Sequence, residues 1–366
     1  MGKVSIVRTN KGIKKSLIRA ISLIDGLEKY ISHNDIIMLK PNLNGTEGIT
    51  NVNLVESLIQ LLQDFNVKEI IIAESTFGNQ HITDMCFVKN GYTELAKKYG
   101  IKLINLNRSE IIEVDVKKPL ILNKLKIAKE VFEVDSIINL PIMKVHYATA
   151  ITLALKNLKG LLVGDEKRHF HEVGLDKAIV DLNNTIKPKL NIVDCISCME
   201  RMGPRGGDII DLNLIMAGGD SAEVDYIGSL IMDYTLDEVK HLKYYIEDNK
   251  IDLSKIEIVG EKINDVKYSF KKAKMENIIP QGFKIKNKNA CSACMNAFLL
   301  SCQLLEEDIT KKVDVYLGSI IDEDDITDGF KIAFGNCCKK DIEFNEIIRG
   351  CPPYPYDLKN VWGKKE

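Results

Sequence analysis

Apolar runs that alternate with amphipathic segments constrain the fold of this 366-residue chain more than any other feature. The predicted strands are 3–8 (KVSIVR), 36–39 (IIML), 69–76 (EIIIAEST), 189–196 (KLNIVDCI) and 256–260 (IEIVG), and the predicted helices between them include 12–30, 51–61, 149–162 and 175–186. Continuous apolar strands that alternate with amphipathic helices are typical of a parallel sheet covered on both faces. We therefore expect an α/β fold, with a mostly parallel sheet and flanking helices.

Polar residues follow or end these strands and a further predicted apolar strand, which begins near residue 139 and leads into Lys144 and His146. They are Lys40 and Asn42, Glu74 and Ser75, Lys144 and His146, and Asp194. Ligand sites of open α/β sheets lie beyond the carboxyl ends of the strands, so these residues are candidates for one site. For any one of them alone, the alternative is that residues leaving a strand are polar because loops are polar.

The stretch 139–207 carries the densest set of candidates. After Lys144 and His146, the predicted helix 149–162 has a core stripe of leucine and isoleucine and a second face formed by Thr149, Thr152, Lys156 and Lys159. A helix that follows a strand end directs its first N–H groups at the site, and nearby lysines make it a receptor for an anion. The alternative is a solvated lysine face. The glycine-rich turn 203–207 contains Arg205 and allows close approach of the backbone to a ligand.

We expect proton transfer or charge stabilisation from Lys144, His146, Lys156 and His169. Substrate contacts are expected from Lys40, Asn42, Thr152, Asn157, Lys167 and Arg205. Histidine titrates in the right range for acid–base work. His169 and His171 would face the same way on a strand and would be unconstrained on a loop. With His146 they could instead bind a metal or be structural, and His33, His81 and His241 are interpreted as surface residues.

The cysteines indicate a metal centre near the end of the chain. Six of the nine follow residue 290, beginning with the pair Cys291 and Cys294 in a CxxC spacing. Two further thiolates, Cys337 and Cys351, would complete four soft ligands, which suits a [4Fe–4S] cluster or, alternatively, Zn²⁺. Cys338 could replace Cys337, Cys302 is interpreted as a core residue, and the remaining alternative is that all are ordinary thiols.

A second CxxC, Cys195 and Cys198, follows Asp194 directly. It could be a redox dithiol, a nucleophile or a sulfur carrier, because nearby lysine or histidine charge activates a thiolate. It could also share a metal with Cys291 and Cys294, or the two residues could simply fill space.

Composition and charge exclude several classes of protein. The net charge of −2, with both signs spread along the chain, gives no footprint for nucleic acid or an anionic membrane. No apolar run reaches the roughly 20 residues of a membrane helix. The first residues show no export signal, so we expect a cytoplasmic protein without disulfides. The lysine-rich stretch 261–289 predicts a boundary between a core domain, 1–262, and a cysteine-rich module, 263–366.

Several separated motifs occur in an order that resembles the family catalogued as domain of unknown function 362. They are Lys40–Leu43, Lys144–His146, Thr152–Gly160, Asp181–Leu182, Val193–Asp194, Gly203–Pro204, and Asp220 with Asp225, and they cover roughly residues 3–260. The resemblance implies iron–sulfur chemistry, often through an appended ferredoxin-like segment, but no general activity. This chain lacks the C-x₂-C-x₂-C-x₃-C-P run, so one cluster is expected, and Cys195 and Cys198 lie outside the family pattern.

The sequence as a whole predicts an iron–sulfur enzyme that acts on a small anionic substrate in a lysine- and histidine-lined pocket. The cluster would serve either as an electron source or as a Lewis acid. Two alternatives remain open: a non-catalytic electron-transfer or binding protein, and a zinc-stapled hydrolase or isomerase. The partners that fit the leading hypothesis are the anionic substrate, an electron donor such as a ferredoxin, and a second copy of the chain.

Overall fold

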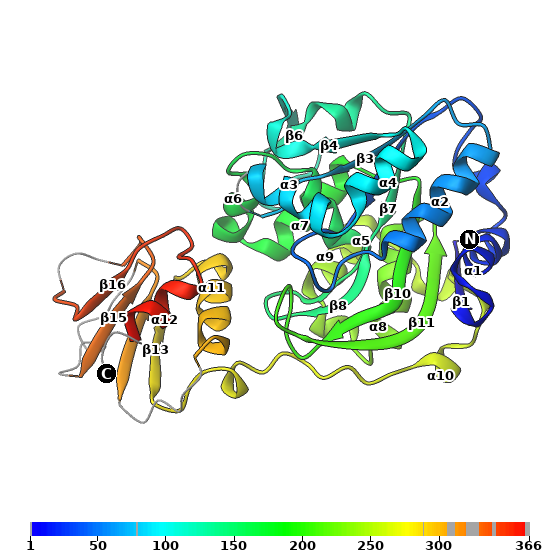
Figure 1. Ribbon diagram of the computed structural model, residues 1–366. Helices are drawn as coiled ribbons and strands as arrows, with labels where there is room; N and C mark the ends of the chain where they lie inside the picture. Colours follow the sequence, from blue (N-terminus) through cyan, green and yellow to red (C-terminus); the bar gives the residue numbers. More distant parts are fainter. Residues whose placement is uncertain are drawn as a thin grey trace. The chain divides into compact units, whose positions relative to one another are not determined.

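The chain folds into two compact units, Met1–Ala273 and Lys274–Glu366 (Figure 1). The computed structural model describes residues 2–77, 80–287, 289–305, 312–319, 329–338 and 342–362. The division falls after the sequence-predicted boundary at 262. The reason is that the short helix α10 (Ile263–Val266) and the segment after it return to the first unit, where Val266 and Phe270 are buried in its core.

The first unit is built on a ten-stranded sheet with the order β12-β1-β11-β10-β7-β2-β3-β4, in which β8 also pairs with β10 and β9 pairs with β8. Its strands are β1 (Lys3–Arg8), β2 (Ile36–Pro41), β3 (Glu69–Glu74), β4 (Lys102–Asn105), β7 (Ser136–Leu140), β8 (Ile142–His146), β9 (Ala150–Thr152), β10 (Leu190–Glu200), β11 (Asp208–Gly218) and β12 (Glu257–Gly260). The strands from β10 to β4 pair in parallel, whereas β11 is antiparallel to both its neighbours. A separate antiparallel ribbon joins β5 (Ile111–Asp115) to β6 (Lys124–Ala128).

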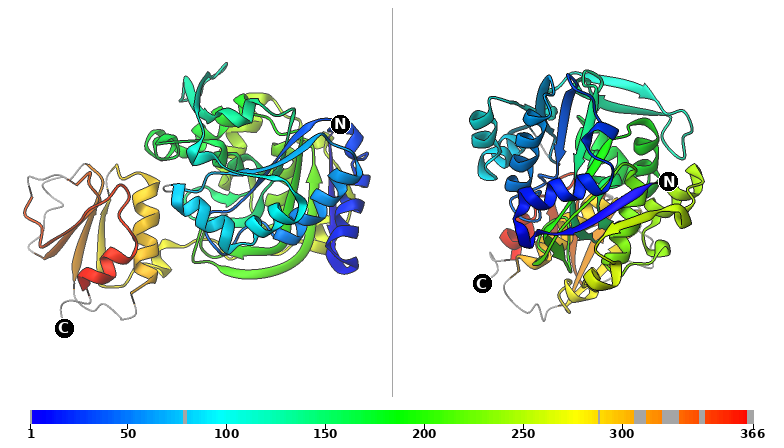
Figure 2. Two further views of the ribbon diagram at one scale, coloured as in Figure 1. Left: turned by 45° about the horizontal axis from the view of Figure 1, so that its top comes forward. Right: turned by 90° about the vertical axis from the view of Figure 1, so that its right-hand side faces the viewer.

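Helices cover both faces of this sheet, as the views in Figure 2 show. They are α1 (Ile13–Leu23), α2 (Val52–Asp64), α3 (Gln80–Lys89), α4 (Tyr92–Tyr99), α5 (Ala154–Asn157), α6 (Glu166–Val173), α7 (Leu175–Thr185), α8 (Ser221–Ile231) and α9 (Lys240–Asn249). Successive strand residues enter opposite cores: Leu39 packs with α1, α2 and α4, whereas Met38 packs with α5, α7, α8 and α9. Burial on both faces explains why these strands read as continuous apolar runs.

The predicted helix over 149–162 is wrong in its first half. Residues 150–152 form β9, which pairs antiparallel with β8, and helical structure begins only at α5 and continues as the 3-10 turn η5 (Leu158–Leu161). The cause is tertiary: the buried Asp225 carboxylate accepts hydrogen bonds from Ala154 N at 2.6 Å and Leu155 N at 3.0 Å. Those N–H groups, which we expected to receive an anion, are therefore occupied by a side chain of the protein.

One strand prediction near residue 200 also needs correction, and one strand was not predicted. The strand expected over 189–196 continues to Glu200, so Asp194 lies inside β10, where it accepts hydrogen bonds from Asn51 N and Ile196 N. The long strand β11 was not predicted. The pairing of β10 with β11 shifts its register between Cys195 and Ser197, as at a β-bulge or a similar irregularity.

The second unit is a smaller α/β unit. Its parallel sheet has the order β13-β14-β15-β16, formed by β13 (Phe283–Asn287), β14 (Val313–Leu317), β15 (Phe330–Phe334) and β16 (Glu346–Ile348). Its helices are α11 (Ser292–Gln303) and α12 (Tyr356–Trp362). Phe298 of α11 packs edge-on against Phe334 of β15, with ring centroids 5.5 Å apart. Among the described residues of the whole chain, no helix is both long and apolar enough to cross a membrane.

Candidate functional site

A buried ion pair lies at the carboxyl ends of two neighbouring strands. Lys40, near the end of β2, places its Nζ 2.7 Å from Glu74 Oε2, at the end of β3, and also donates to Pro41 O. Burial lowers the pKa of Lys40 and raises the pKa of Glu74, while the attraction between the two groups opposes both shifts. Gly160 makes room for the pair, because a Cβ atom there would lie 2.0 Å from Glu74 Oε1 and 2.4 Å from Lys40 Nζ.

Lys167 of α6 reaches the strand end next to Glu74. Its Nζ donates to Ser75 O at 2.6 Å, to Ser75 Oγ and to Thr76 O. The Ser75 hydroxyl in turn donates to Gly160 O and Leu162 O. Burial lowers the pKa of Lys167 to about 7, with the nearby Glu74 acting in the opposite direction. Because the three hydrogens of an ammonium group find three oxygen acceptors here, Lys167 fixes the position of this loop.

An amide network joins β2 to β8 and α5. Lys144 of β8 donates from Nζ to Asn42 Oδ1 at 3.0 Å and to Gly48 O at 2.9 Å. Asn42 donates to Asn157 Oδ1, and Asn157 donates to Lys40 O and to Asn139 Oδ1. Burial and the charge of Arg205 lower the pKa of Lys144 to about 7. The structure therefore brings these residues of the predicted site together.

Lys156, Lys159, His146 and His171 form the rest of the site. Lys156 Nζ lies 3.1 Å from Thr152 Oγ1, and Lys159 Nζ lies 3.0 Å from His171 Nε2. Burial and the charges of Lys159 and Lys144 hold the pKa of Lys156 well below its usual range. Burial, followed by the charges of Lys156 and the other neighbouring bases, depresses the pKa of His146 in the same way. Together with Lys40, Lys144 and Lys167, these four residues are called the cationic cluster.

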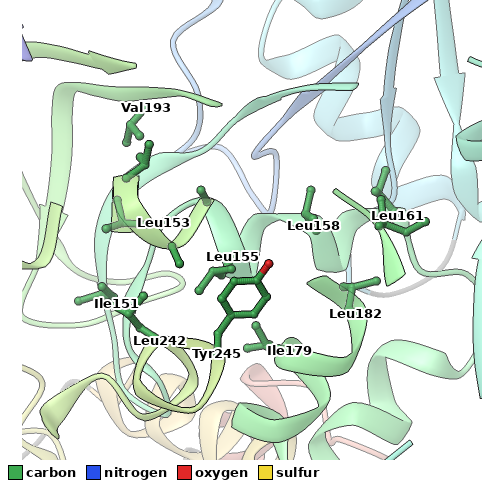
Figure 3. Close-up of a cluster of buried hydrophobic side chains, with 14 of the residues drawn as sticks. Ile151, Leu153, Leu155, Leu158, Leu161, Ile179, Leu182, Val193, Leu242 and Tyr245 are labelled. Atoms are coloured by element: carbon green, nitrogen blue, oxygen red, sulfur yellow. The ribbon is translucent and has the colours of Figure 1, made fainter. Parts of the chain in front are cut away.

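An apolar layer under α5 and η5 explains the strength of these shifts. Figure 3 shows Leu155, Leu158 and Leu161 gathered with side chains from α7 and α9. Those partners are Ile179, Leu182, Leu242 and Tyr245. Amines that are buried without carboxylate partners lose hydration, so their neutral forms are favoured.

Two predicted residues stand apart from the centre of the cluster. His169 and His171 lie on helix α6, so their side chains do not face the same way as they would on a strand, and that interpretation was wrong. His169 is exposed and lies beside Glu172, with Nδ1 3.8 Å from Oε2. Arg205 is bound to the loop after β2, donating to Asn44 O and Asn44 Oδ1. It acts on the cluster through its charge on Lys144.

The site includes residues that the predicted set lacks. Lys159 and His171 belong to the cluster, although the predicted set contained Lys156 and His169 in their place. The spacing of three residues between Lys156 and Lys159, on one face of the predicted helix, was the sequence feature that could have identified Lys159. Behind Lys156 lie Asp176 of α7 and His241 of α9, whose nearest side-chain atoms are 3.5 Å apart. The surface assignment of His241 was wrong, because the residue is fully buried. His33 and His81 are exposed, as expected.

The second unit gathers four cysteines at the carboxyl ends of its parallel strands. Cys291 follows β13 and Cys294 stands in the first turn of α11, while Cys337 follows β15 and Cys351 follows β16. A hydrogen bond with Cys291, burial, and the nearby thiols of Cys351 and Cys337 raise the pKa of Cys294. At Gly335 a Cβ atom would lie 3.2 Å from Cys294 Sγ, so the glycine leaves space beside this thiol.

The remaining cysteines are turned elsewhere. Cys338 donates from Sγ to Tyr316 O at 3.1 Å, and Cys302 is buried in the core of its unit, as predicted. Cys195 and Cys198 are fully buried inside β10, where burial raises the pKa of both thiols well above the usual range. A reactive thiolate is therefore not favoured there. Among the described residues, no three His, Cys, Asp or Glu side chains are grouped so that they could hold a metal ion.

Comparison with known proteins identifies the family. The model of the family described as domain of unknown function 362 matches residues 37–229, which span β2 to α8 and include every member of the cationic cluster. The chain belongs to this family. A curated relative, a thylakoid-associated protein of Synechocystis sp., is 28% identical over 239 residues, which cover 61% of this chain and 72% of the relative.

Solved structures show only a distant likeness. A crystal structure of a Thermotoga maritima protein has 13% identity and a TM-score of 0.41, covering 84% of this chain and 70% of that one. The lactate racemase apoprotein of Thermoanaerobacterium thermosaccharolyticum has 10% identity and a TM-score of 0.40, covering 86% and 69%. At this distance neither structure bears on the function of the chain.

Proposed function

We propose that this protein is an iron–sulfur enzyme whose first unit binds a small anionic substrate in the cationic cluster. The observation that carries the proposal is the imbalance of buried charge. Five lysines converge, and among the described residues Glu74 is the carboxylate paired with one of them, Lys40. Burying amines without counter-ions is costly unless a ligand supplies the missing negative charge.

The residues of the cationic cluster would have different roles. Lys167 has three protein acceptors, and Lys40 pairs with Glu74 and Pro41 O, so these two lysines hold the scaffold and contribute charge. Lys156 and Lys159 each have one polar partner among the described residues, so they are available to an anion. His146 accepts a hydrogen bond at Nδ1 from Ala148 N, which leaves the proton on Nε2 and makes that nitrogen a donor to the substrate.

The second unit would carry a [4Fe–4S] cluster on Cys291, Cys294, Cys337 and Cys351. In a cubane each cysteine binds a different iron, so the thiols stand farther apart than the ligands of a single ion. Four sulfurs on one Zn²⁺ would be about 3.8 Å apart, from Zn–S bonds of about 2.3 Å in a tetrahedron. The mutual interactions of these thiols and the space that Gly335 leaves beside Cys294 support a shared centre on the four cysteines. With a thiolate on every iron, such a cluster would supply one electron at a time; an open iron that acts as a Lewis acid would require that only three of the four thiols bind.

Calorimetric titration of the full-length protein with pyrophosphate, inorganic phosphate and oxalate tests the anion site. We expect at least one of these anions to bind, and binding to weaken at least tenfold in Lys144→Met and Lys156→Met. Lys97→Met is the matched control, because Lys97 is exposed on α4 and pairs with Glu94. Absence of binding by all three anions, or an equal loss in Lys97→Met, would show that the cluster is not an anion site.

A further inference from the structure

The lysines of the cationic cluster differ in how well the protein satisfies them. A charged ammonium group has three donors and no acceptor. Lys167 has three oxygen acceptors, Lys144 has two, and Lys40 has a carboxylate and a carbonyl. Lys156 has a single partner among the described residues, the hydroxyl of Thr152, which can donate to a neutral amine as readily as it can accept.

Lys156 is also buried beside other bases. It is 9% exposed, and the charges of Lys159 and Lys144 act on it while the apolar layer of Figure 3 lies beneath its helix. Lys159 differs, since it is partly exposed and its Nζ lies over the Phe170 ring, 5.8 Å from the centroid, where a cation is stabilised. A desolvated lysine beside other cations keeps its lone pair and becomes a nucleophile.

We propose that Lys156 is a nucleophilic amine that forms an imine with the carbonyl carbon of a 2-oxo acid bound in the cationic cluster, an inference that rests on the proposed anion site. The class follows from the arrangement of charge. The cations around Lys156 attract a carboxylate, and a 2-oxo acid carries its electrophilic carbon one bond from that carboxylate. A neutral aldehyde or ketone would gain nothing from Lys144 and Lys159.

The step is a condensation that needs no oxidant or reductant. The lone pair of Lys156 Nζ attacks the carbonyl carbon, and the electron pair of the C=O bond moves to oxygen, where a proton transferred from nitrogen gives a carbinolamine. The remaining proton on nitrogen then passes to the hydroxyl, which leaves as water with the electrons of the C–O bond, while the nitrogen lone pair forms the C=N bond and the Nε2 proton of His146 donates a hydrogen bond to the departing oxygen. The products are an imine and one water molecule, and the imine nitrogen activates the neighbouring carbon for proton removal or bond cleavage.

Reductive trapping tests this inference. Full-length protein is incubated anaerobically with pyruvate, 2-oxobutyrate or 2-oxoglutarate, treated with sodium borohydride, digested and analysed by mass spectrometry. The expected result is one reduced adduct on the peptide containing Lys156, from at least one of the three acids. An anion that binds the site should reduce the yield at least tenfold by competition. Lys156→Arg should give no adduct, whereas the surface variant Lys97→Met should give the wild-type yield.

The outcomes separate this inference from the proposed function. If calorimetry shows that the 2-oxo acids compete with a bound anion but no adduct forms on Lys156, the imine is refuted and the anion site stands. An adduct on Lys159 or Lys144 instead would overturn the assignment of Lys156. If none of the oxo acids, pyrophosphate, phosphate or oxalate binds, both proposals fail. Circular dichroism of Lys156→Arg confirms that a lost adduct does not result from unfolding.

Discussion

The cationic cluster of the first unit and the four cysteines of the second unit both lie at the carboxyl ends of parallel strands. They differ in how the protein holds them. The lysines repel one another, and Glu74, Ser75, Asn42 and several carbonyl groups tie them in place. The thiols of the second unit act on one another instead: a hydrogen bond with Cys291 and the nearby thiols of Cys351 and Cys337 raise the pKa of Cys294. Sheet topology thus selects where a site forms, and the side chains decide whether it is preformed or assembled by its ligand.

The largest expected effect concerns the cysteines of the second unit and the iron that they would bind. Cys294→Ser should abolish the roughly four iron and four sulfide per chain expected of a cubane, because each thiolate is one of its four ligands. Metal and labile-sulfide analysis of anaerobically purified protein measures this. Cys338→Ser is the matched control, because Cys338 donates to a backbone carbonyl, and it should keep the full iron content. Equal loss in both variants, or one zinc per chain in the wild type, would refute the assignment.

The second effect tests whether the ion pair of Lys40 and Glu74 holds the cationic cluster in place. Glu74→Gln leaves Lys40 buried without its counter-ion, and breaking such a pair typically costs about 3–5 kcal/mol. Urea unfolding measures the loss in free energy of unfolding. Glu94→Gln removes an exposed carboxylate from Lys97 and should cause no comparable change. A Glu74→Gln protein as stable as wild type would mean that the cluster is not held by this pair.

The pH dependence of stability sharpens the comparison, because among the described residues the buried lysines all lie in the first unit. The pKa of Lys144 falls from 10.5 to about 7 on folding, so between these values the unfolded chain binds the proton and the folded chain does not. Stability should therefore rise with pH in this window, by up to about 1.4 kcal/mol per pH unit for each such group. Lys144→Met should reduce the slope measured by urea unfolding between pH 8 and 9. An unchanged slope would contradict the depressed pKa.

The smallest expected effect concerns His241. It is fully buried, and among the described residues neither ring nitrogen makes a well-formed hydrogen bond, since Nδ1 lies 3.5 Å from Asp176 Oδ1. Replacing a polar group that gains no hydrogen bond with an apolar one of similar size should change the free energy of unfolding by less than about 1 kcal/mol. His241→Phe, followed by urea unfolding, tests this expectation. A loss several times larger would mean that the imidazole has a structural role that its contacts do not explain.

Much of the fold could be predicted from the sequence because burial on both faces leaves a clear pattern. The strands around Leu39 and Ile72 read as apolar runs, and the polar residues that end them lie close together. The helix over 149–162 failed because its spacing is compatible with a helix but Asp225, far along the chain, fixes where helical structure begins. Spacing carries no information about such a distant cap.

The candidate site shows the same limit. Lys144, Lys156 and Lys167 could be selected from strand ends and motif order, whereas the burial of His241 depends on how α7 and α9 pack, which no local pattern encodes. His169 was chosen over His171 because the sequence does not reveal which side of α6 faces inward. Only the helix itself, with its turn of about 100° per residue, separates the two side chains.

Because Gly160 has no side chain, η5 can approach the ends of β2 and β3, which carry Lys40 and Glu74. The methyl group of alanine at this position would force Lys40 and Glu74 apart or displace the turn that carries Lys159. Every charged residue of the cluster would remain. A change at this one uncharged residue would therefore alter the geometry of the cationic cluster. Substituting alanine and then larger residues for Gly160 would distort the cluster in steps, with all its lysines and histidines still present.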